Sequence, residues 1–191
     1  MDDTVEQAVA AFCKNSAQRP DGRAVTAALL QLERAAKQAK VAIPLKSLLG
    51  TWRLCFNAGK GAKFEAEEPT GNGFYIPKLA ITRLAFTDDS AGECSLAISN
   101  ELHVGPLQVH FTGPARYPGR KNLLAFDFTQ LQVSCFGLKV YQGKVESKKR
   151  AGKPFQEIPM GQLPFFAFFA AQEQYLAARG RGGGLAIWVK E

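Results

Sequence analysis

A short stretch near residue 50 alternates apolar and polar side chains, and this pattern constrains the fold more than any other. Trp52, Leu54 and Phe56 share one face of an extended chain, and the residues between them are Arg and Cys. A period of two predicts a half-buried strand rather than a helix. Gly50, just before it, allows the chain to turn in closely, and the indole of Trp52 has the volume to plug the end of a small barrel.

More strands are expected after this one, because short apolar segments alternate with turn residues as far as residue 145. The pattern predicts strands over residues 78–87, 93–103, 106–117, 121–130 and 131–145. The segments between several of them, such as Asp88-Asp89-Ser90-Ala91-Gly92, carry typical turn residues. Many short strands at this spacing are typical of an antiparallel barrel or sandwich.

Two amphipathic helices are expected before the strands, over about residues 4–15 and 24–39. The second helix has one apolar stripe, and its other face carries basic residues that include Lys37 and Lys40. Such a face is usually solvated, although it can also lie on an anionic membrane. The predicted fold class is therefore mainly β (α+β). Residues 1–45 form a helical segment that packs on a barrel over residues 46–191, in a single domain.

The most apolar run, residues 163–171, holds four phenylalanines at positions i, i+1, i+3 and i+4. This spacing fits a short helix with a broad apolar face, and we expect it to cap one end of the barrel before the last hairpin, residues 175–188. The alternative is a surface that ligands pass or that dips into lipid. The four residues are Phe165, Phe166, Phe168 and Phe169.

The overall charge favours anionic partners. The net charge is +7 and the pI is near 9.3, which suits lipid head groups, nucleic acid or an acidic protein surface. Lys148, Lys149, Arg150 and Lys153 are candidates for peripheral contact with an anionic membrane, where each basic residue contributes about 1 kcal/mol. The alternative is a loop that only keeps the protein in solution. Nucleic-acid binding ranks lower, because the chain has one short Arg-Gly segment rather than repeated tracts.

The sequence offers few groups for catalysis. His103 and His110 flank a predicted turn and have no partners at metal-ligand spacing. No nucleophile elbow, phosphate-binding loop or zinc-protease motif occurs. The four cysteines are far apart and form no Cys-x-x-Cys pair, which predicts free thiols in a reducing compartment. We therefore expect no enzyme activity, no cofactor and no metal.

The chain start has no recognisable targeting segment. Met1-Asp2-Asp3 is acidic, without the apolar core of a secretory signal or the Arg-rich composition of a transit peptide. The longest apolar run is shorter than the ~20 residues that a bilayer span needs. The sequence predicts a soluble or peripheral protein.

The two ends of the strand-rich region carry a family resemblance. The first end is a Leu-rich helix followed by Leu49-Gly50-Thr51-Trp52-Arg53-Leu54. The second is Arg179-Gly180-Arg181-Gly182-Gly183-Gly184-Leu185-Ala186-Ile187-Trp188-Val189, a glycine-rich turn followed by an apolar strand. Together they resemble the plastid-lipid-associated protein (fibrillin) family, which is lipocalin-like. The resemblance implies a lipocalin-like antiparallel β-barrel and non-catalytic binding of a small hydrophobic molecule, such as a lipid, a carotenoid or a quinone.

The resemblance also implies a location and a way to close the barrel. Proteins of this kind associate peripherally with the cytoplasmic face of a cyanobacterial thylakoid, or with the plastid stroma, plastoglobule or thylakoid. Gly50, Trp52 and Arg179 are the expected closing residues, with the guanidinium of Arg179 stacked over the indole of Trp52. The chain departs from the family's Tyr-Leu-Asp element, since Tyr175 and Leu176 are followed by alanine. A lipocalin-like bilin lyase acting on phycobiliproteins is the alternative.

Alternation along the expected strands gives a set of inward positions. Their side chains are apolar, which suits a carotenoid, a quinone or an acyl chain in the barrel. The alternative is an interior that the large phenylalanines fill completely. The list depends on the facing parity of each strand, because a shift of one residue inverts it. The positions are Trp52, Leu54, Phe56, Leu84, Phe86, Leu96, Ile98, Val109, Phe111, Phe126, Phe128, Val133 and Cys135.

Overall fold

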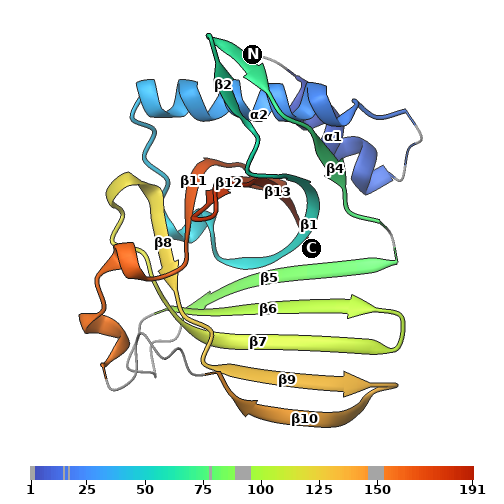
Figure 1. Ribbon diagram of the computed structural model, residues 1–191, viewed down its shortest axis with the longest axis vertical. Coiled ribbons are helices and arrows are strands. Elements are labelled where there is room, and N and C mark those ends of the chain that lie inside the picture. The colour runs from blue at the N-terminus through green and yellow to red at the C-terminus, as the bar shows by residue number, and fades with distance from the viewer. Residues whose placement is uncertain (1–2, 15, 17, 78, 89–95, 146–152) are drawn as a thin grey trace.

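In the computed structural model the chain forms a β-barrel with two helices lying across one side of it (Figure 1). The structure describes residues 3–14, 16, 18–77, 79–88, 96–145 and 153–191. Within that part of the chain, eight antiparallel strands close the barrel, which confirms the predicted fold and is consistent with a lipocalin-like barrel. They are β1 (Gly50–Ala58), β5 (Ala80–Asp88), β6 (Leu96–Val104), β7 (Leu107–Arg116), β8 (Leu123–Phe126), β11 (Phe165–Ala171), β12 (Tyr175–Gly180) and β13 (Leu185–Lys190).

The barrel strands follow one another in chain order, and the last closes on the first. β13 pairs with β1 from Trp52 opposite Lys190 to Ala58 opposite Leu185. Closure of the ring gives each of these strands a neighbour on both sides, which is how up-and-down barrels limit edge pairing with other molecules. The hairpin predicted near the C-terminus is β12 and β13. Its glycine-rich turn includes Gly183 at φ +90°, a conformation that favours glycine.

One barrel strand, β7, divides between two partners. Its end pairs with β8, whereas Leu107–Thr112 pair with β9 (Gln130–Cys135). β9 turns into β10 (Leu138–Lys144), so the hairpin β9–β10 extends the sheet beyond the barrel and β10 forms its outer edge (Figure 1). The prediction of one strand over residues 131–145 was wrong, because Phe136 turns the chain there with φ +50°.

Gly113 makes this division of β7 possible. A Cβ at Gly113 would lie 1.8 Å from the carbonyl oxygen of Asp127, where the chain passes from β8 to β9. The amides of Asp127 and Thr129 donate hydrogen bonds to the carbonyls of Pro114 and Thr112, at 3.0 and 2.9 Å. Any side chain at position 113 would push this crossing away from β7.

The remaining elements are short, and β3 and β4 contact helix α2. β4 pairs with the second half of β1, and β2 and β3 form a separate hairpin. Their bounds, with those of the 3-10 helices, are β2 (Lys63–Glu65), β3 (Glu68–Thr70), β4 (Gly73–Tyr75), η1 (Leu45–Ser47), η2 (Arg120–Asn122), η3 (Phe155–Glu157) and η4 (Met160–Gln162).

The two helices, α1 (Thr4–Lys14) and α2 (Gly22–Gln38), lie close to the predicted ranges. The carboxylate of Asp21 caps α2 by accepting hydrogen bonds from the amides of Arg23 and Ala24, both at 2.8 Å. The apolar faces of both helices pack on the outside of the barrel and form a core with it. Members of this helix-side core are Val5, Val9, Val25, Leu29, Cys55, Phe56, Phe169, Tyr175, Leu185 and Ile187.

The Phe-rich run is a strand, β11, and the prediction of a short helix there was wrong. β11 pairs with β8 and β12, and helix α2 covers its outer side. A strand buried on both faces is apolar throughout, so its sequence has no period of two to distinguish it from a helix. A β-bulge at Phe169 shifts the register as well. Phe166 and Phe168 contact the barrel interior, Phe169 contacts the helices, and Phe165 packs near Leu163.

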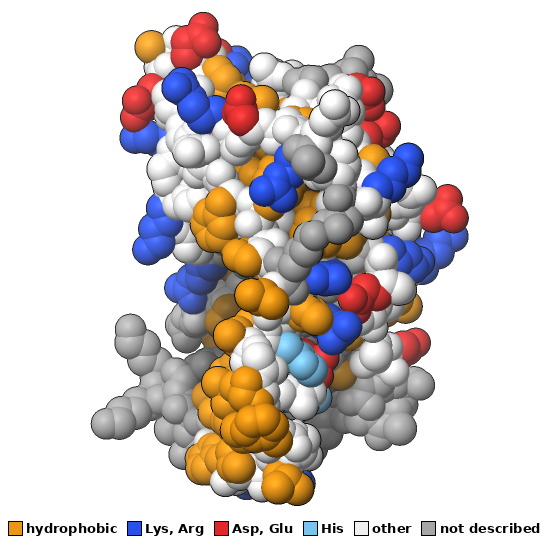
Figure 2. All heavy atoms as spheres, turned by 90° about the vertical axis from the view of Figure 1, so that its right-hand side faces the viewer, with side chains coloured by type: hydrophobic (Ala, Val, Ile, Leu, Met, Phe, Trp, Pro, Cys, Tyr) orange, Lys and Arg blue, Asp and Glu red, His pale blue; other side chains and the backbone are white. Residues whose placement is uncertain are grey.

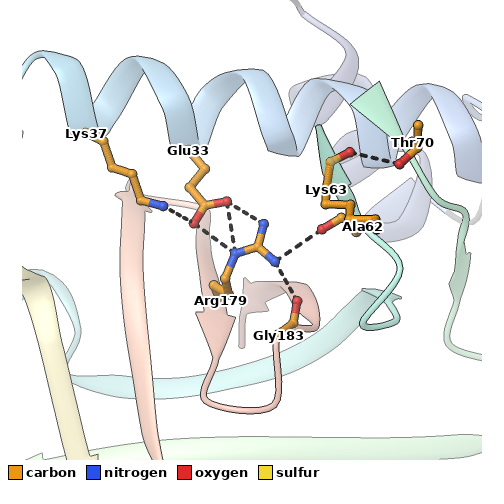
Figure 3. A network of polar contacts seen from close by, with 7 residues as sticks. All are labelled: Glu33, Lys37, Ala62, Lys63, Thr70, Arg179 and Gly183. Carbon is orange, nitrogen blue, oxygen red and sulfur yellow. Dashed lines mark hydrogen bonds and ion pairs between the residues drawn. The ribbon is translucent and has the colours of Figure 1, made fainter. Parts of the chain in front are cut away.

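Arg179 on β12 attaches helix α2 to the barrel through a buried ion pair (Figure 3). Its Nε lies 2.9 and 3.0 Å from the two carboxylate oxygens of Glu33, and its Nη2 lies 2.6 Å from Oε2. Its Nη1 donates to the carbonyls of Gly183 and Ala62, at 2.5 and 3.3 Å. The Glu33 side chain is only 7% exposed and also accepts from Lys37 at 2.8 Å. One guanidinium therefore joins the helix, the last turn and the loop before β2.

The prediction that Arg179 stacks over Trp52 was wrong. Ala178 faces the barrel interior, so its neighbour Arg179 points to the opposite face, where the helix lies. The cation over the Trp52 ring is Lys190, whose Nζ lies 5.5 Å from the ring centroid. Trp52 is 1% exposed, and its Nε1 donates to the carbonyl of Leu48 at 2.8 Å.

Replacement of Arg179 by methionine is expected to destabilise the protein. Among the described residues, Lys37 would remain as the cationic partner of the buried Glu33, and removal of one member of a buried ion pair costs about 3 kcal/mol. Chemical unfolding monitored by circular dichroism measures this. The matched control is Arg34→Met on the same helix, since Arg34 pairs with Glu67 in an exposed salt bridge worth at most about 1 kcal/mol. Equal effects of the two substitutions would contradict the assigned role.

The same ion pair makes stability depend on pH. Burial alone raises the pKa of Glu33, but hydrogen bonds and charge from Arg179 and Lys37 outweigh it and hold that pKa below its ordinary value. A depressed folded-state pKa stabilises the protein above the unfolded-state value of about 4.3, and the contribution is lost as the pH falls through the folded-state pKa. The difference in unfolding free energy between wild type and Glu33→Gln should therefore shrink when pH is lowered from 7 through this range. If the difference in unfolding free energy stays constant over this pH range, the ionisation of Glu33 is not linked to stability.

Candidate functional site

The deep part of the barrel is filled by side chains, many of them aromatic. The rings of Phe126 and Phe166 stack with centroids 5.1 Å apart, and Phe166 meets Trp188 edge to face at 5.3 Å. Phe86 and Phe168 form another edge-to-face pair at 6.0 Å. Such pairs are stabilising beyond the area they bury. At depth, therefore, the barrel is a packed core.

Most of the predicted inward residues contact this interior core. Phe56 instead packs on the helix side, at 5.2 Å from the Tyr75 ring. The β-bulge at Cys55 places an extra residue in β1, so the facing of every later side chain inverts. The interpretation of Phe56 as an interior residue was therefore wrong. The predicted residues in the interior core are Trp52, Leu54, Leu84, Phe86, Leu96, Ile98, Phe126 and Phe128.

The other predicted residues are not inside the barrel, as had been expected, but on β7 and β9 where the sheet leaves it: Val109, Phe111, Val133 and Cys135. Val109 on β7 is directly opposite Val133 on β9, and Phe111 is opposite Leu131. All four are half-buried. The ring of Phe128 lies 5.4 Å from Phe111 and connects this surface to the interior, since it also lies 5.1 Å from Phe126. We call Val109, Phe111, Phe128, Leu131 and Val133 the mouth face.

Beyond the mouth face, the same side of the sheet becomes exposed. Phe136, in the turn of the hairpin β9–β10, is 83% exposed. Figure 2 shows hydrophobic side chains gathered at the lower end of this side of the molecule. Such contiguous apolar surface usually marks a contact with a partner, a ligand or a membrane. We call the exposed residues the hairpin patch: Val104, Leu107, Phe136, Leu138, Val140 and Tyr141.

The opposite face of the extended sheet is polar. Glu101 accepts a hydrogen bond from Gln108, the Nε2 of His103 lies 2.8 Å from its carboxylate, and Arg83 lies 3.5 Å from it. Burial raises the pKa of Glu101, but His103, Gln108 and Arg83 beside it outweigh this effect and keep that pKa below its ordinary value. One face of the extended sheet is thus polar and suited to solvent, whereas the other face is apolar.

A separate hollow of about 500 Å³ lies between the C-terminal end of α2 and the barrel. Its apolar wall comes from the helix, from β8 and β11, and from the segment after α2. Charged residues surround it, among them the two lysines noted on the basic helix face. The lining comprises Glu33, Ala36, Lys37, Lys40, Val41, Ala42, Gly119, Lys121, Asn122, Leu123, Ala167, Phe168 and Phe169. The sequence did not indicate this hollow, because its lining combines residues that are far apart in the chain, such as Lys40 and Lys121.

The predicted membrane surface is only partly described by the structure. Lys148, Lys149 and Arg150 lie outside the described residues, and Lys153 is exposed. The phenylalanines of β11 are half-buried or buried, so they are not a surface for lipid. This part of the prediction was wrong, because β11 is a barrel strand rather than a capping helix.

Groups suited to catalysis are sparse in the described part of the chain. No cluster of three or more His, Cys, Asp or Glu side chains is placed there to hold a metal ion. Burial raises the pKa of the Cys55 thiol to about 12, which keeps it protonated. None of the described helices is both long enough and apolar enough to cross a membrane. No family model matches this chain, and no match was found among curated proteins.

Proposed function

We propose that this protein binds a small hydrophobic molecule, without catalysis, at the open side of its barrel. The observation that carries the proposal is one continuous apolar surface, which runs from the interior core across the mouth face to the hairpin patch. Ligand sites for such molecules are mostly apolar and aromatic, with few polar groups. The mouth face has this composition. Because side chains fill the deeper barrel, the ligand is expected at the mouth rather than at the closed end.

We further propose that the hairpin patch contacts an anionic membrane. Phe136 has φ +50°, which is unfavourable for a bulky residue, and its ring is in solvent. An exposed phenylalanine at this position does not stabilise the fold, whereas its ring could be buried by insertion into lipid. Residues 128–145 contain Lys139 and Lys144 and no acidic residue, so the hairpin complements anionic lipids. Each lysine near such a surface contributes about 1 kcal/mol.

The proposal extends to family and location. Pairing of the strand that begins at Gly50 with the strand that follows the glycine-rich turn supports membership of the plastid-lipid-associated (fibrillin) family. In that case the ligand is a lipid, a carotenoid or a quinone. The location is then the cytoplasmic face of a cyanobacterial thylakoid, or the plastid stroma, plastoglobule or thylakoid.

Substitution of Val133 by glutamate is expected to weaken ligand binding at least about tenfold, because it places a charge in an apolar site. The probe is a fluorescent polyene fatty acid titrated into the protein. Gln132→Glu is the matched control: it adds the same charge to the neighbouring residue, which faces the polar side of the same strand. Its effect should be less than about twofold. Equal losses in the two variants, or no loss in either, would contradict a site at the mouth face.

Substitution of Phe136 by asparagine is expected to reduce binding to vesicles that contain phosphatidylglycerol, measured by co-sedimentation. Asparagine tolerates a positive φ, so the unfolding free energy should stay equal or rise slightly. The control is Phe74→Asn, since Phe74 on β4 is 57% exposed but lies near the helices, away from the hairpin. The proposal is overturned if Phe136→Asn binds vesicles like wild type. It is also overturned if this substitution instead abolishes self-association in solution, because a second copy would then cover the patch.

A further inference from the structure

The hollow between α2 and the barrel has no role in the function proposed above. Its position is separate from the mouth face, since it is lined by the end of the helix, by η2 and by β11. We infer that it is a second binding site, which takes an anionic amphiphile: a molecule with a carboxylate or phosphate head on an acyl chain. Its volume of about 500 Å³ lies within the range of small-molecule sites.

The floor of the hollow suits an acyl chain. Ala36 of α2 and Val41 of the following segment form one side, and Leu123, Phe168 and Phe169 form the other. Phe168 also belongs to the interior core, where its ring lies 6.5 Å from that of Trp188. Its ring is therefore shared between the hollow and the interior core.

The rim of the hollow suits an anionic head. Lys37, Lys40 and Lys121 line it, against one acid, Glu33. Glu33 already has Arg179 as its partner, in addition to Lys37. Among the described residues, neither Lys40 nor Lys121 forms an ion pair, so their charges are available to a ligand.

Of Lys40 and Lys121, the position of Lys121 is the stronger evidence for an anion site. Lysines near the end of a helix, such as Lys37 and Lys40, are common because they offset its dipole. Lys121 belongs to η2, across the hollow from the helix, so the dipole does not explain it. Two lysines from different elements facing one apolar hollow form a divided cationic rim.

The rim contains strained backbone. Lys40 and Lys121 have φ of +50° and +57°, which costs a lysine about 1–2 kcal/mol, and their neighbour in η2, Asn122, has φ +50°, which asparagine tolerates. The Asn122 amide holds the two sides together: its Nδ2 donates to the carbonyl of Val41 at 2.7 Å, and its Oδ1 accepts from the amide of Ile43 at 3.0 Å. Strain that buried bonds maintain is typical of sites formed before the ligand arrives.

The test uses isothermal titration of the intact protein with dodecanoate, with dodecanol and with acetate. The mouth-face variant Val133→Glu serves as the background, so that binding at the mouth face is weakened and the hollow dominates the signal. Dodecanoate should bind, dodecanol should bind at least about tenfold more weakly, and acetate should not bind at all. Replacement of Lys40 and Lys121 by glutamine should weaken dodecanoate binding about tenfold, because both charges are lost. Both lysines are exposed, so folding should be unaffected, as circular dichroism would verify.

Lys46→Gln is the matched control, because Lys46 lies on η1 and does not line the hollow. The inference is overturned if dodecanol binds as tightly as dodecanoate, if acetate binds as tightly as dodecanoate, or if replacing both lysines leaves dodecanoate binding equal to that of the Val133→Glu background. It is also overturned if Val133→Glu alone abolishes dodecanoate binding. That last result would support the mouth face as the sole site, so failure here and failure of the proposed function are distinguishable.

Discussion

The shortness of β8 decides the shape of this molecule. Its four residues reach only the last part of the ten-residue strand β7, so the remainder of β7 needs another partner. Backbone groups that lose water without gaining a partner cost as much as a lost hydrogen bond. The hairpin β9–β10 supplies the partners, and Gly113 gives the chain room to cross to it. The hairpin β9–β10 therefore extends the apolar, interior-facing side of the sheet beyond the barrel. The mouth face and the hairpin patch both follow from that branch.

The helices seal the barrel on its other side. Arg179 and Glu33 attach α2 to β12, and the apolar faces of both helices cover the strands beneath them. The aromatic core fills the barrel from within. With one side covered and the deep interior occupied, the extended sheet presents an open apolar surface, apart from the hollow beside α2. A barrel of this kind is suited to holding an apolar molecule partly in its mouth and partly against the hairpin, rather than enclosing it.

Much of the fold follows from local patterns in the sequence, whereas the facing of several residues does not. Alternation from Trp52 predicts a strand, and the turn residues after it predict an antiparallel barrel. The β-bulges at Cys55 and Phe169 each add one residue to a strand and so invert the facing of later side chains, and no local sequence pattern predicts them. Phe56 was placed on the wrong side for this reason. The prediction of a helix at β11 was wrong because both faces of that strand are buried, one by the helices and one by the barrel interior, so the sequence has no period of two. The ion pair of Arg179 could not be predicted either, because its partner, Glu33, is 146 residues away in sequence. Val109, Phe111 and Val133 were expected inside the barrel; their place on the mouth face depends on the branch at β7, which long-range strand pairing determines.

The central claim is that an apolar molecule occupies the mouth of this barrel. The most direct measurement is to purify the protein from a photosynthetic host, record its absorption spectrum and identify the contents of its solvent extract by mass spectrometry. The account predicts a lipid, a carotenoid or a quinone in a fixed ratio to protein. An extract without any apolar molecule would contradict it, and a bilin in its place would favour a lyase instead.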